Sequence, residues 1–242
     1  MNIQISLILS FLAGLGTLLG SFLIFVPKLN KTTYIPLFLS ISATIMFSFS
    51  FLDLIPESII YIFSNINTPK SFFLIIIPFL FGVLVIEVLD KIYNEENGLK
   101  KIGILSFISL AIHNFPEGIA TFISSIVNIK LGISLSIGIM LHNIPEGICI
   151  AMPLYHSTKN KRKVLSIALI ASLAEPLGAI IAYAFLKDNI NNLTISIILL
   201  FVAGLMINLS INNIYKKVLN DKKNMIKGII IGILISIIAI LI

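Results

Sequence analysis

Long runs of apolar residues alternate with short polar segments along the whole chain. Eight runs stand out, at residues 4–26, 34–61, 70–92, 101–125, 130–152, 163–186, 194–215 and 225–242. Each is near the roughly 20 apolar residues that a helix needs to cross a bilayer, and far longer than a typical strand of about 5–6 residues. The pattern therefore predicts an all-α membrane protein with eight transmembrane helices.

Composition agrees with this interpretation. Hydrophobic residues make up 57% of the chain, charged residues make up 12%, and the mean hydropathy is +1.06, all outside the usage of soluble domains. Eight spans with short loops use the whole chain, so residues 1–242 are expected to form a single polytopic transmembrane domain. Residues 1–4, at the start of the first run, contain no Lys or Arg, and the run exceeds the core of a signal peptide. We therefore expect it to be a retained transmembrane helix.

Basic residues are distributed unevenly among the connections. The connections after the first, third, fifth and seventh runs hold 14 of the 17 Lys and Arg residues: Lys28, Lys31, Lys91, Lys100, Lys101, Lys159, Lys161, Arg162, Lys163, Lys216, Lys217, Lys222, Lys223 and Lys227. The other connections hold only Lys70, Lys130 and Lys187. Because short cytoplasmic loops carry the excess of Lys and Arg, this predicts a cell-membrane protein with both termini outside the cytoplasm. The net charge of +6 then reflects topology and does not indicate nucleic-acid binding.

Cysteine usage and loop motifs exclude several classes of protein. Cys149 is the only cysteine, which rules out a disulfide framework or a Cys-based metal cage, and we expect it to serve helix packing. The short loops contain neither a Gly-rich nucleotide-binding motif nor a Walker-type lysine. Any transport is therefore expected to run without built-in ATP hydrolysis.

Several polar residues fall inside the predicted spans, where they are costly to bury. They are Asp53, Glu57, His113, Asn114, Glu117, His142, Asn143, Glu146 and Glu175. A carboxylate in the middle of a bilayer costs about 2.5–3.5 kcal/mol on insertion scales. Since the basic residues lie at or near the helix ends, a bound cation is the natural counter-charge for these carboxylates.

One octet occurs twice, as HNFPEGIA at 113–120 and as HNIPEGIC at 142–149. His and Glu at i and i+4 lie on one helix face, and Asn at i+1 is an i, i+3 neighbour of that Glu. Each octet therefore offers nitrogen and oxygen ligands on one face. Imidazole and carboxylate without thiolate suit Zn²⁺, Fe²⁺, Mn²⁺ or Co²⁺, whereas an all-oxygen set would favour Mg²⁺ or Ca²⁺.

Proline and glycine accompany these ligands. Pro116 and Pro145 lack the N–H that would bond the carbonyl four residues earlier, so we expect kinks in helices 101–125 and 130–152. The segments AEPLG at 174–178 and DLIPE at 53–57 likewise place carboxylates beside proline. Gly118 and Gly147 are expected to let neighbouring helices approach closely. The kinked helices 101–125, 130–152 and 163–186 are thus predicted to bind the metal.

These motifs resemble the Zrt/Irt-like (ZIP) family of metal transporters, in particular its bacterial broad-range zinc transporter branch. The resemblance spans nearly the whole chain, and its specific parts are HNFPEGIA, HNIPEGICIAMPLY and LAEPLGA. It implies eight helices, external termini and inward metal movement.

The resemblance also implies site residues. A centre for one or two metal ions would be formed by His113, Asn114, Glu117, His142, Asn143, Glu146 and Glu175, with Glu117 and Glu146 as bridges. Met46 resembles a thioether ligand of some members, although a Met in an apolar helix usually packs. Asp53 and Glu57 resemble acidic residues at the entrance or exit of the pathway.

Two features depart from the family pattern. Asn212 and Asn213 stand where relatives often carry an acidic pair, which weakens any role for the helix at 194–215. The loop at 93–98 lacks the usual histidine-rich tract, so zinc sensing by this loop is not expected.

The sequence therefore predicts a transporter, not an enzyme, that takes up divalent metal ions, chiefly Zn²⁺, by alternating access. Zinc or another divalent ion is the substrate, and no catalytic cofactor is expected. A selective ion channel is an alternative that the residues do not separate from a carrier. An intramembrane metalloenzyme is disfavoured because HNxPE is not the HExxH arrangement of zinc proteases. Homodimer formation remains open.

The distribution of basic residues yields the first prediction, which concerns orientation. Single cysteines introduced in the loop at 159–163 should be protected from an impermeant thiol reagent applied to whole cells, whereas cysteines at either terminus should react. The measurement is labelling before and after membrane permeabilisation, in a Cys149→Ala background. Reactive loop cysteines together with protected termini would reverse the orientation.

Overall fold

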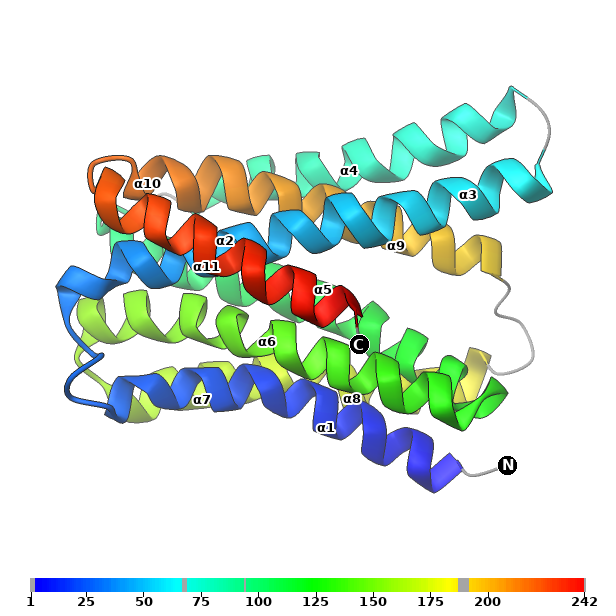
Figure 1. The fold of residues 1–242 in the computed structure, drawn as a ribbon, viewed down its shortest axis with the longest axis horizontal. Coiled ribbons are helices and arrows are strands. Elements are labelled where there is room, and N and C mark those ends of the chain that lie inside the picture. The colour runs from blue at the N-terminus through cyan, green and yellow to red at the C-terminus, as the bar shows by residue number, and fades with distance from the viewer. Residues whose placement is uncertain (1–2, 67–68, 94, 187–191, 242) are drawn as a thin grey trace.

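The computed structural model describes residues 3–66, 69–93, 95–186 and 192–241, and all regular structure in these residues is helical. Figure 1 shows long helices that run side by side along one common direction. Seven helical segments of the described chain are long and apolar enough to cross a membrane. The helix α11 (Lys222–Leu241), with 20 residues, corresponds to the eighth predicted span. The prediction of an all-helical protein with membrane spans is confirmed.

The spans are built from the following elements. The first span consists of α1 (Ile3–Ser21) and η1 (Phe22–Phe25). The second consists of η2 (Thr32–Tyr34), α2 (Ile35–Phe49), the π-helical η3 (Ser50–Leu54) and α3 (Ile55–Asn65). The third is α4 (Lys70–Ile92), and the fourth is α5 (Gly98–Val127). The fifth span is α6 (Ile129–Thr158). The sixth consists of α7 (Lys161–Ser172), α8 (Ala174–Ile181) and the π-helical η4 (Ala182–Leu186). The seventh consists of α9 (Asn192–Asn208), the π-helical η5 (Leu209–Tyr215) and α10 (Lys216–Val218). Each overlaps one predicted run. Lys187, which entered the orientation argument, lies outside the described residues.

Asparagine caps set the starts of three helices. Asn97, Asn128 and Asn160 each accept a hydrogen bond from a backbone N–H in the first turn of α5, α6 and α7, respectively. A cap of this kind satisfies a backbone donor that the helix leaves unpaired. Helix α6 also continues to Thr158, beyond the predicted end at residue 152, and Leu154 and Tyr155 of this extension pack in the main apolar cluster.

The helices form two groups that meet along α2 and α6. In the first group, α1, α5, α6 and the α7–α8 segment pack on one another; in the second group, α2, α3, α4, α9 and α11 do so. In Figure 1, α1, α7 and α8 lie along the lower edge, and α3, α4 and α9 lie along the upper edge. Helix α2 contacts α6 across the boundary between the groups. These two groups are called the first and second helix groups below.

The predicted kinks have a mixed outcome. Helices α5 and α6 run through Pro116 and Pro145 without a break in the helix, so kinks at these prolines remain a prediction. A break does occur at Leu173, between α7 and α8 and two residues before Glu175. The π-helical η3 similarly precedes Pro56. Departures from regular α-helix thus lie beside the AEPLG motif at 174–178 and the DLIPE motif at 53–57.

The predicted close approach at the glycines is confirmed. A Cβ atom on Gly118 would collide with the carbonyl oxygen of Glu175, and one on Gly147 would collide with the carbonyl oxygen of Thr17. These two glycines therefore let α5 approach α8 and α6 approach α1 at the level of the backbone, which brings the polar segments of four helices together.

This packing yields a matched pair of substitutions on α6. Gly147→Ala should lower stability by about 1–3 kcal/mol, the usual cost of overpacking, because the Thr17 backbone must move. A Cβ atom added to Gly138 would have no neighbouring atom within 4 Å, so Gly138→Ala should not destabilise the protein. Thermal unfolding of the purified proteins in detergent measures the difference. Equal unfolding temperatures for the two variants would contradict the proposed close contact.

Candidate metal centre

The two octets face each other because α5 and α6 are antiparallel neighbours joined at Asn128. His113 and His142 lie at nearly equal distances along the chain from this residue, so they reach the same height between the helices. Glu117 is closer to Asn128 and Glu146 is farther from it. One glutamate is therefore placed on each side of the histidine pair along the helix axis.

The distances join these four side chains into one cluster. His142 Nε2 lies 3.2 Å from Glu117 Oε1, and His113 Nε2 lies 3.3 Å from Glu146 Oε1. His113 Nδ1 also lies 3.5 Å from Glu117 Oε1. The two imidazole rings are 6.3 Å apart between centroids. The closest contacts thus run between helices, from each histidine to the glutamate of the other octet.

The cluster is buried and has unused ligand atoms. Its least buried members, Glu117 and His142, are only 6% and 5% exposed. Atoms without a hydrogen-bond partner are His113 Nδ1, Asn114 Oδ1, Glu117 Oε2, His142 Nδ1, Asn143 Oδ1, Glu146 Oε1 and Glu175 Oε2. Buried polar atoms are normally paired, and this concentration of ligand atoms is compatible with a cation site. His113, His142 and Glu146 each offer one ligand atom, and these three atoms lie within 4.8 Å of one another. This group is compact enough to hold one ion.

The two asparagines orient their amides in the same way. Asn114 Nδ2 donates to the Ala171 carbonyl oxygen at 3.3 Å, and Asn143 Nδ2 donates to the Ala13 carbonyl oxygen at 3.2 Å. Their donor groups are therefore occupied by neighbouring helices. The amide oxygens, which are the atoms that a cation would bind, remain available.

Glu175 joins the cluster through an asparagine. It is fully buried on α8, and its Oε1 accepts a hydrogen bond from Asn143 Nδ2 at 2.5 Å. It does not belong to the compact group of three ligands. The structure thus places Glu175 at the edge of the cluster, in contact with one of the other predicted site residues.

Helix α2 supplies the wall on the other side of α6. The Phe49 ring packs on the His142 ring at 4.7 Å between centroids, and the Ser42 hydroxyl donates to the Pro145 carbonyl oxygen at 2.5 Å. Met46 lies between these two residues in sequence and is fully buried in the main apolar cluster. Sequence reasoning missed Ser42 and Phe49, although their i−4 and i+3 spacing from Met46 places them on the same helix face.

The remaining predicted residues lie outside the compact ligand group, although Asp53 is close enough to His142 and Glu117 to interact with their charges. Asp53 and Glu57 are exposed, on η3 and α3, beyond Phe49 in the direction away from the basic loops. Cys149 is buried in the main apolar cluster, in keeping with a packing role.

Lysine ion pairs of the described residues are found at the basic end of the molecule and not in the cluster. Lys100 pairs with Glu95, and Lys101 pairs with Asp90 at 3.0 Å. The hydrogen bond from Lys100 lowers the pKa of Glu95. The buried carboxylates instead face His113 and His142.

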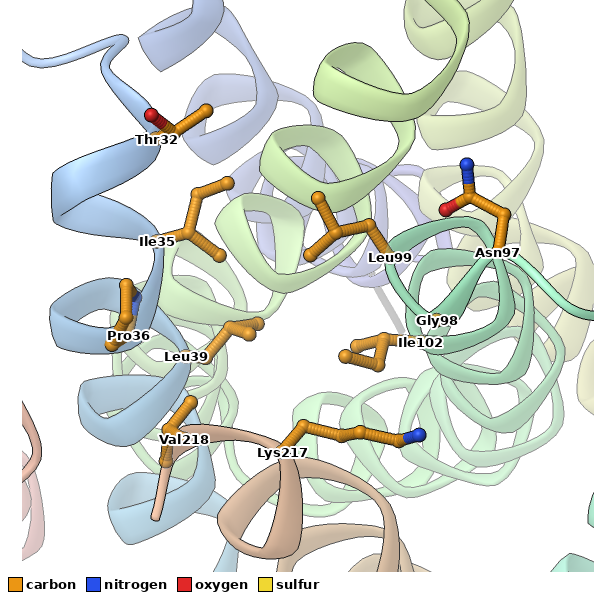
Figure 2. A pocket seen from close by; sticks show the side chains of 10 residues that line it. All are labelled: Thr32, Ile35, Pro36, Leu39, Asn97, Gly98, Leu99, Ile102, Lys217 and Val218. Carbon is orange, nitrogen blue, oxygen red and sulfur yellow. The ribbon is translucent and has the colours of Figure 1, made fainter. Parts of the chain in front are cut away.

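A separate cavity opens at the basic end, between the two helix groups. It has a volume of about 430 Å³, and Figure 2 shows its walls on α2, the start of α5 and α10. Its polar lining residues are Thr32, Asn97 and Lys217, and its other described lining residues are apolar or glycine. Because this lining offers a lysine and neither carboxylate nor imidazole, the cavity does not have the chemistry of a second cation site.

Comparison with known proteins gives consistent matches. The sequence profile described as "ZIP Zinc transporter" matches residues 90–240. The zinc transporter ZupT of Streptococcus mutans is 35% identical over 223 residues, which cover 86% of this chain and 84% of that protein. ZupT of Oceanobacillus iheyensis is 35% identical over 234 residues, and ZupT of Chlorobium limicola is 37% identical over 232 residues. Each of these two alignments covers 88% of this chain and 87% of the relative.

The histidine content of the cluster predicts a pH dependence of metal binding. Imidazole binds a metal only when neutral, and carboxylate only when ionised, so protons compete with the ion. As the pH falls from about 8 to about 5, the zinc dissociation constant should rise. Where the coordinating imidazoles are protonated in the metal-free protein, the increase should reach about tenfold per pH unit for each of them.

Isothermal titration calorimetry with zinc in non-chelating buffers measures the pH dependence of the dissociation constant. His156→Gln is the control, because His156 lies on α6 near the basic end and outside the compact ligand group. A dissociation constant that stays constant over this pH range would argue against imidazole ligands.

Proposed function

This chain belongs to the ZIP zinc transporter family, and from that membership we propose that it takes up divalent metal ions, chiefly Zn²⁺, through the cluster between α5 and α6. The observation that carries the proposal is the burial of two histidines and two glutamates in mutual contact, with ligand atoms unused. The basic loops face the cytoplasm in this proposal, so the ion moves toward them.

His113, His142 and Glu146 form the core of the proposed metal site, supported by their compact ligand geometry. Glu117 contacts both histidines, and Glu117 and Glu146 would bridge the ions if two are bound. The oxygens of Asn114 and Asn143 and the free Oε2 of Glu175 complete the donor set, which holds one or two ions. Nitrogen and oxygen donors without thiolate suit Zn²⁺ and also accept Fe²⁺, Mn²⁺ or Co²⁺.

Met46 is proposed as an additional thioether ligand. Ser42, Met46 and Phe49 have the i, i+4, i+7 spacing of one helix face, and the outer two contact α6 at Pro145 and His142. The same face directs Met46 toward the part of α6 that carries the ligands. This placement supports a role for Met46 beyond packing.

Asp53 and Glu57 are proposed as the acidic entrance of the pathway. Both are exposed on the side of Phe49 that faces away from the basic loops. Two exposed carboxylates raise the local concentration of cations, which favours metal capture before the ion reaches the buried histidines.

Alternating access fits the distribution of the ligands between the two helix groups. Every proposed ligand except Met46 lies on α5, α6 or α8 of the first group. A movement of the first group relative to the second would carry the site toward one side of the membrane or the other. The cavity at the basic end lies between the same two groups, where such a movement would open or close a passage (Figure 2).

The proposal predicts strong effects at Glu117 and Glu146. Replacement of either by Gln preserves the side-chain volume but removes a negative charge and places an NH₂ group toward the cation. Zinc uptake into proteoliposomes should fall by at least about tenfold. This is the smallest loss of activity that is typical when a group that supports a metal site is replaced. Folding should largely survive, and uptake by the unmodified protein should saturate with zinc concentration.

Glu96→Gln is the matched control, because Glu96 is an exposed residue of the loop between α4 and α5. Solvent and salt screen this charge, so the variant should transport at the unmodified rate. Unmodified transport by Glu117→Gln and Glu146→Gln at equal reconstitution would refute the proposed pathway. Flux that does not saturate would favour a channel.

A further inference from the structure

The hydrogen bond from Ser42 to Pro145 connects the two helix groups beside the metal site. Ser42 is fully buried on α2, and its hydroxyl donates to the carbonyl oxygen of Pro145 on α6 at 2.5 Å. Other interhelical serine bonds near the cluster stay within the first group: Ser172 bonds the Gly14 carbonyl, and Ser136 bonds the Leu9 carbonyl. Ser42 instead reaches across the boundary between groups.

Ser42 behaves differently from its neighbours on the same span. The hydroxyls of Ser40, Thr44 and Ser50 each bond the carbonyl four residues earlier in their own helix. This local bond is the usual partner of Ser or Thr inside a helix. The Thr44 hydroxyl also bonds the Tyr215 hydroxyl of η5, at 2.6 Å, but not a residue of the first helix group. Ser42 donates to another helix, so its hydroxyl serves the contact between α2 and α6.

The acceptor belongs to the peptide group that carries a proposed ligand. The Pro145 carbonyl and the Glu146 nitrogen are part of one planar unit, so a bond that fixes the carbonyl direction also fixes the start of Glu146. A carbonyl has two lone pairs, so the bond from Ser42 is compatible with the ordinary helical bond to the same oxygen. Ser42 therefore constrains the backbone of Glu146 without touching its carboxylate.

We propose that Ser42 is a positioning residue that orients Glu146 for metal binding while α6 lies against α2. This inference rests on the proposed function, because it assumes that Glu146 binds the transported ion. Since Ser42 belongs to the second helix group, the constraint exists only while the two groups are in their present register. A shift of α6 along α2 breaks the bond, frees the Glu146 backbone and weakens the hold on the metal, which couples helix movement to metal release.

The test compares Ser42→Ala with Ser40→Ala. Each removes one hydroxyl from a fully buried position on α2, but the Ser40 hydroxyl bonds within its own helix, and its Cβ faces Gly228 of α11. Ser42→Ala should raise the zinc dissociation constant by about 3- to 10-fold. The lower value corresponds to the loss of an average interhelical hydrogen bond in a membrane, and the upper value to the smallest effect typical of removing a group that orients a metal ligand. Ser40→Ala should stay within about twofold of the unmodified protein.

Two further measurements separate positioning from general stability. Thermal unfolding temperatures of the two variants should be similar, because each loses one hydroxyl hydrogen bond. In proteoliposomes, Ser42→Ala should raise KM for zinc without lowering the maximal rate, since release is not impeded.

Three outcomes would overturn the inference. They are equal zinc affinities of Ser42→Ala and the unmodified protein, equal weakening by both serine variants, and a lower maximal rate at unchanged KM. Glu146→Gln, measured in parallel, distinguishes this failure from that of the proposed function. If Glu146→Gln abolishes zinc binding and Ser42→Ala does not change it, only the role of Ser42 is refuted. If Glu146→Gln binds zinc normally, the metal site itself is refuted.

Discussion

An ionised carboxylate inside a bilayer requires a counter-charge, and the architecture of this protein follows from how Glu117 and Glu146 obtain one. Both are buried, and their ionic contacts among the described residues are with His113 and His142 across the α5–α6 interface. A protonated imidazole compensates a carboxylate, and a divalent ion held by imidazole and carboxylate together would replace those protons as the counter-charge. Either partner offsets the cost of burying these carboxylates, so proton and metal would compete for the same cluster.

Close helix packing is the condition for this arrangement, and α1 provides much of it without contributing a proposed ligand. The buried face of α1 consists of small residues: Ser6, Ser10, Ala13, Gly14, Gly16, Thr17, Gly20 and Ser21. Added Cβ atoms on Gly14, Gly16 and Gly20 would collide with backbone carbonyls of α7 and α6. Because its backbone is this close, the Ala13 carbonyl can accept the amide of Asn143. A helix of small residues thereby orients a ligand of a neighbouring helix.

The spans were predictable from the sequence because the cost of exposing polar backbone in lipid makes apolar length decisive. The run at 70–92 coincides with α4 (Lys70–Ile92). The grouping of the two octets was also predictable, since adjacent antiparallel helices must bring them together. The pairing of each histidine with the glutamate of the other octet was not, because helical spacing describes one helix and not its rotation against the next.

Donor directions were the least predictable part of the site. Sequence treats Asn143 and Glu175 as two candidate ligands of equal standing, yet the structure joins them by a hydrogen bond. Asn143 lies on α6 and Glu175 on α8, and both pack against α1, where Gly14 lies next to Glu175 and Gly16 next to Asn143. That contact therefore depends on tertiary packing. Ser42 carries no sequence signal of its own, since the neighbouring serines and threonine of the same span bond within their own helix.

A transporter must bind its ion firmly enough to select it and weakly enough to release it. A site built entirely on one rigid group would keep the same affinity in every conformation. Here α5, α6 and α8 hold the nitrogen and oxygen donors, while Ser42, Met46 and Phe49 approach them from α2. In the proposed mechanism the coordination environment therefore includes both helix groups, and the affinity for the ion would change if the groups moved relative to each other. The proposed site then lies at the surface along which such a movement would occur.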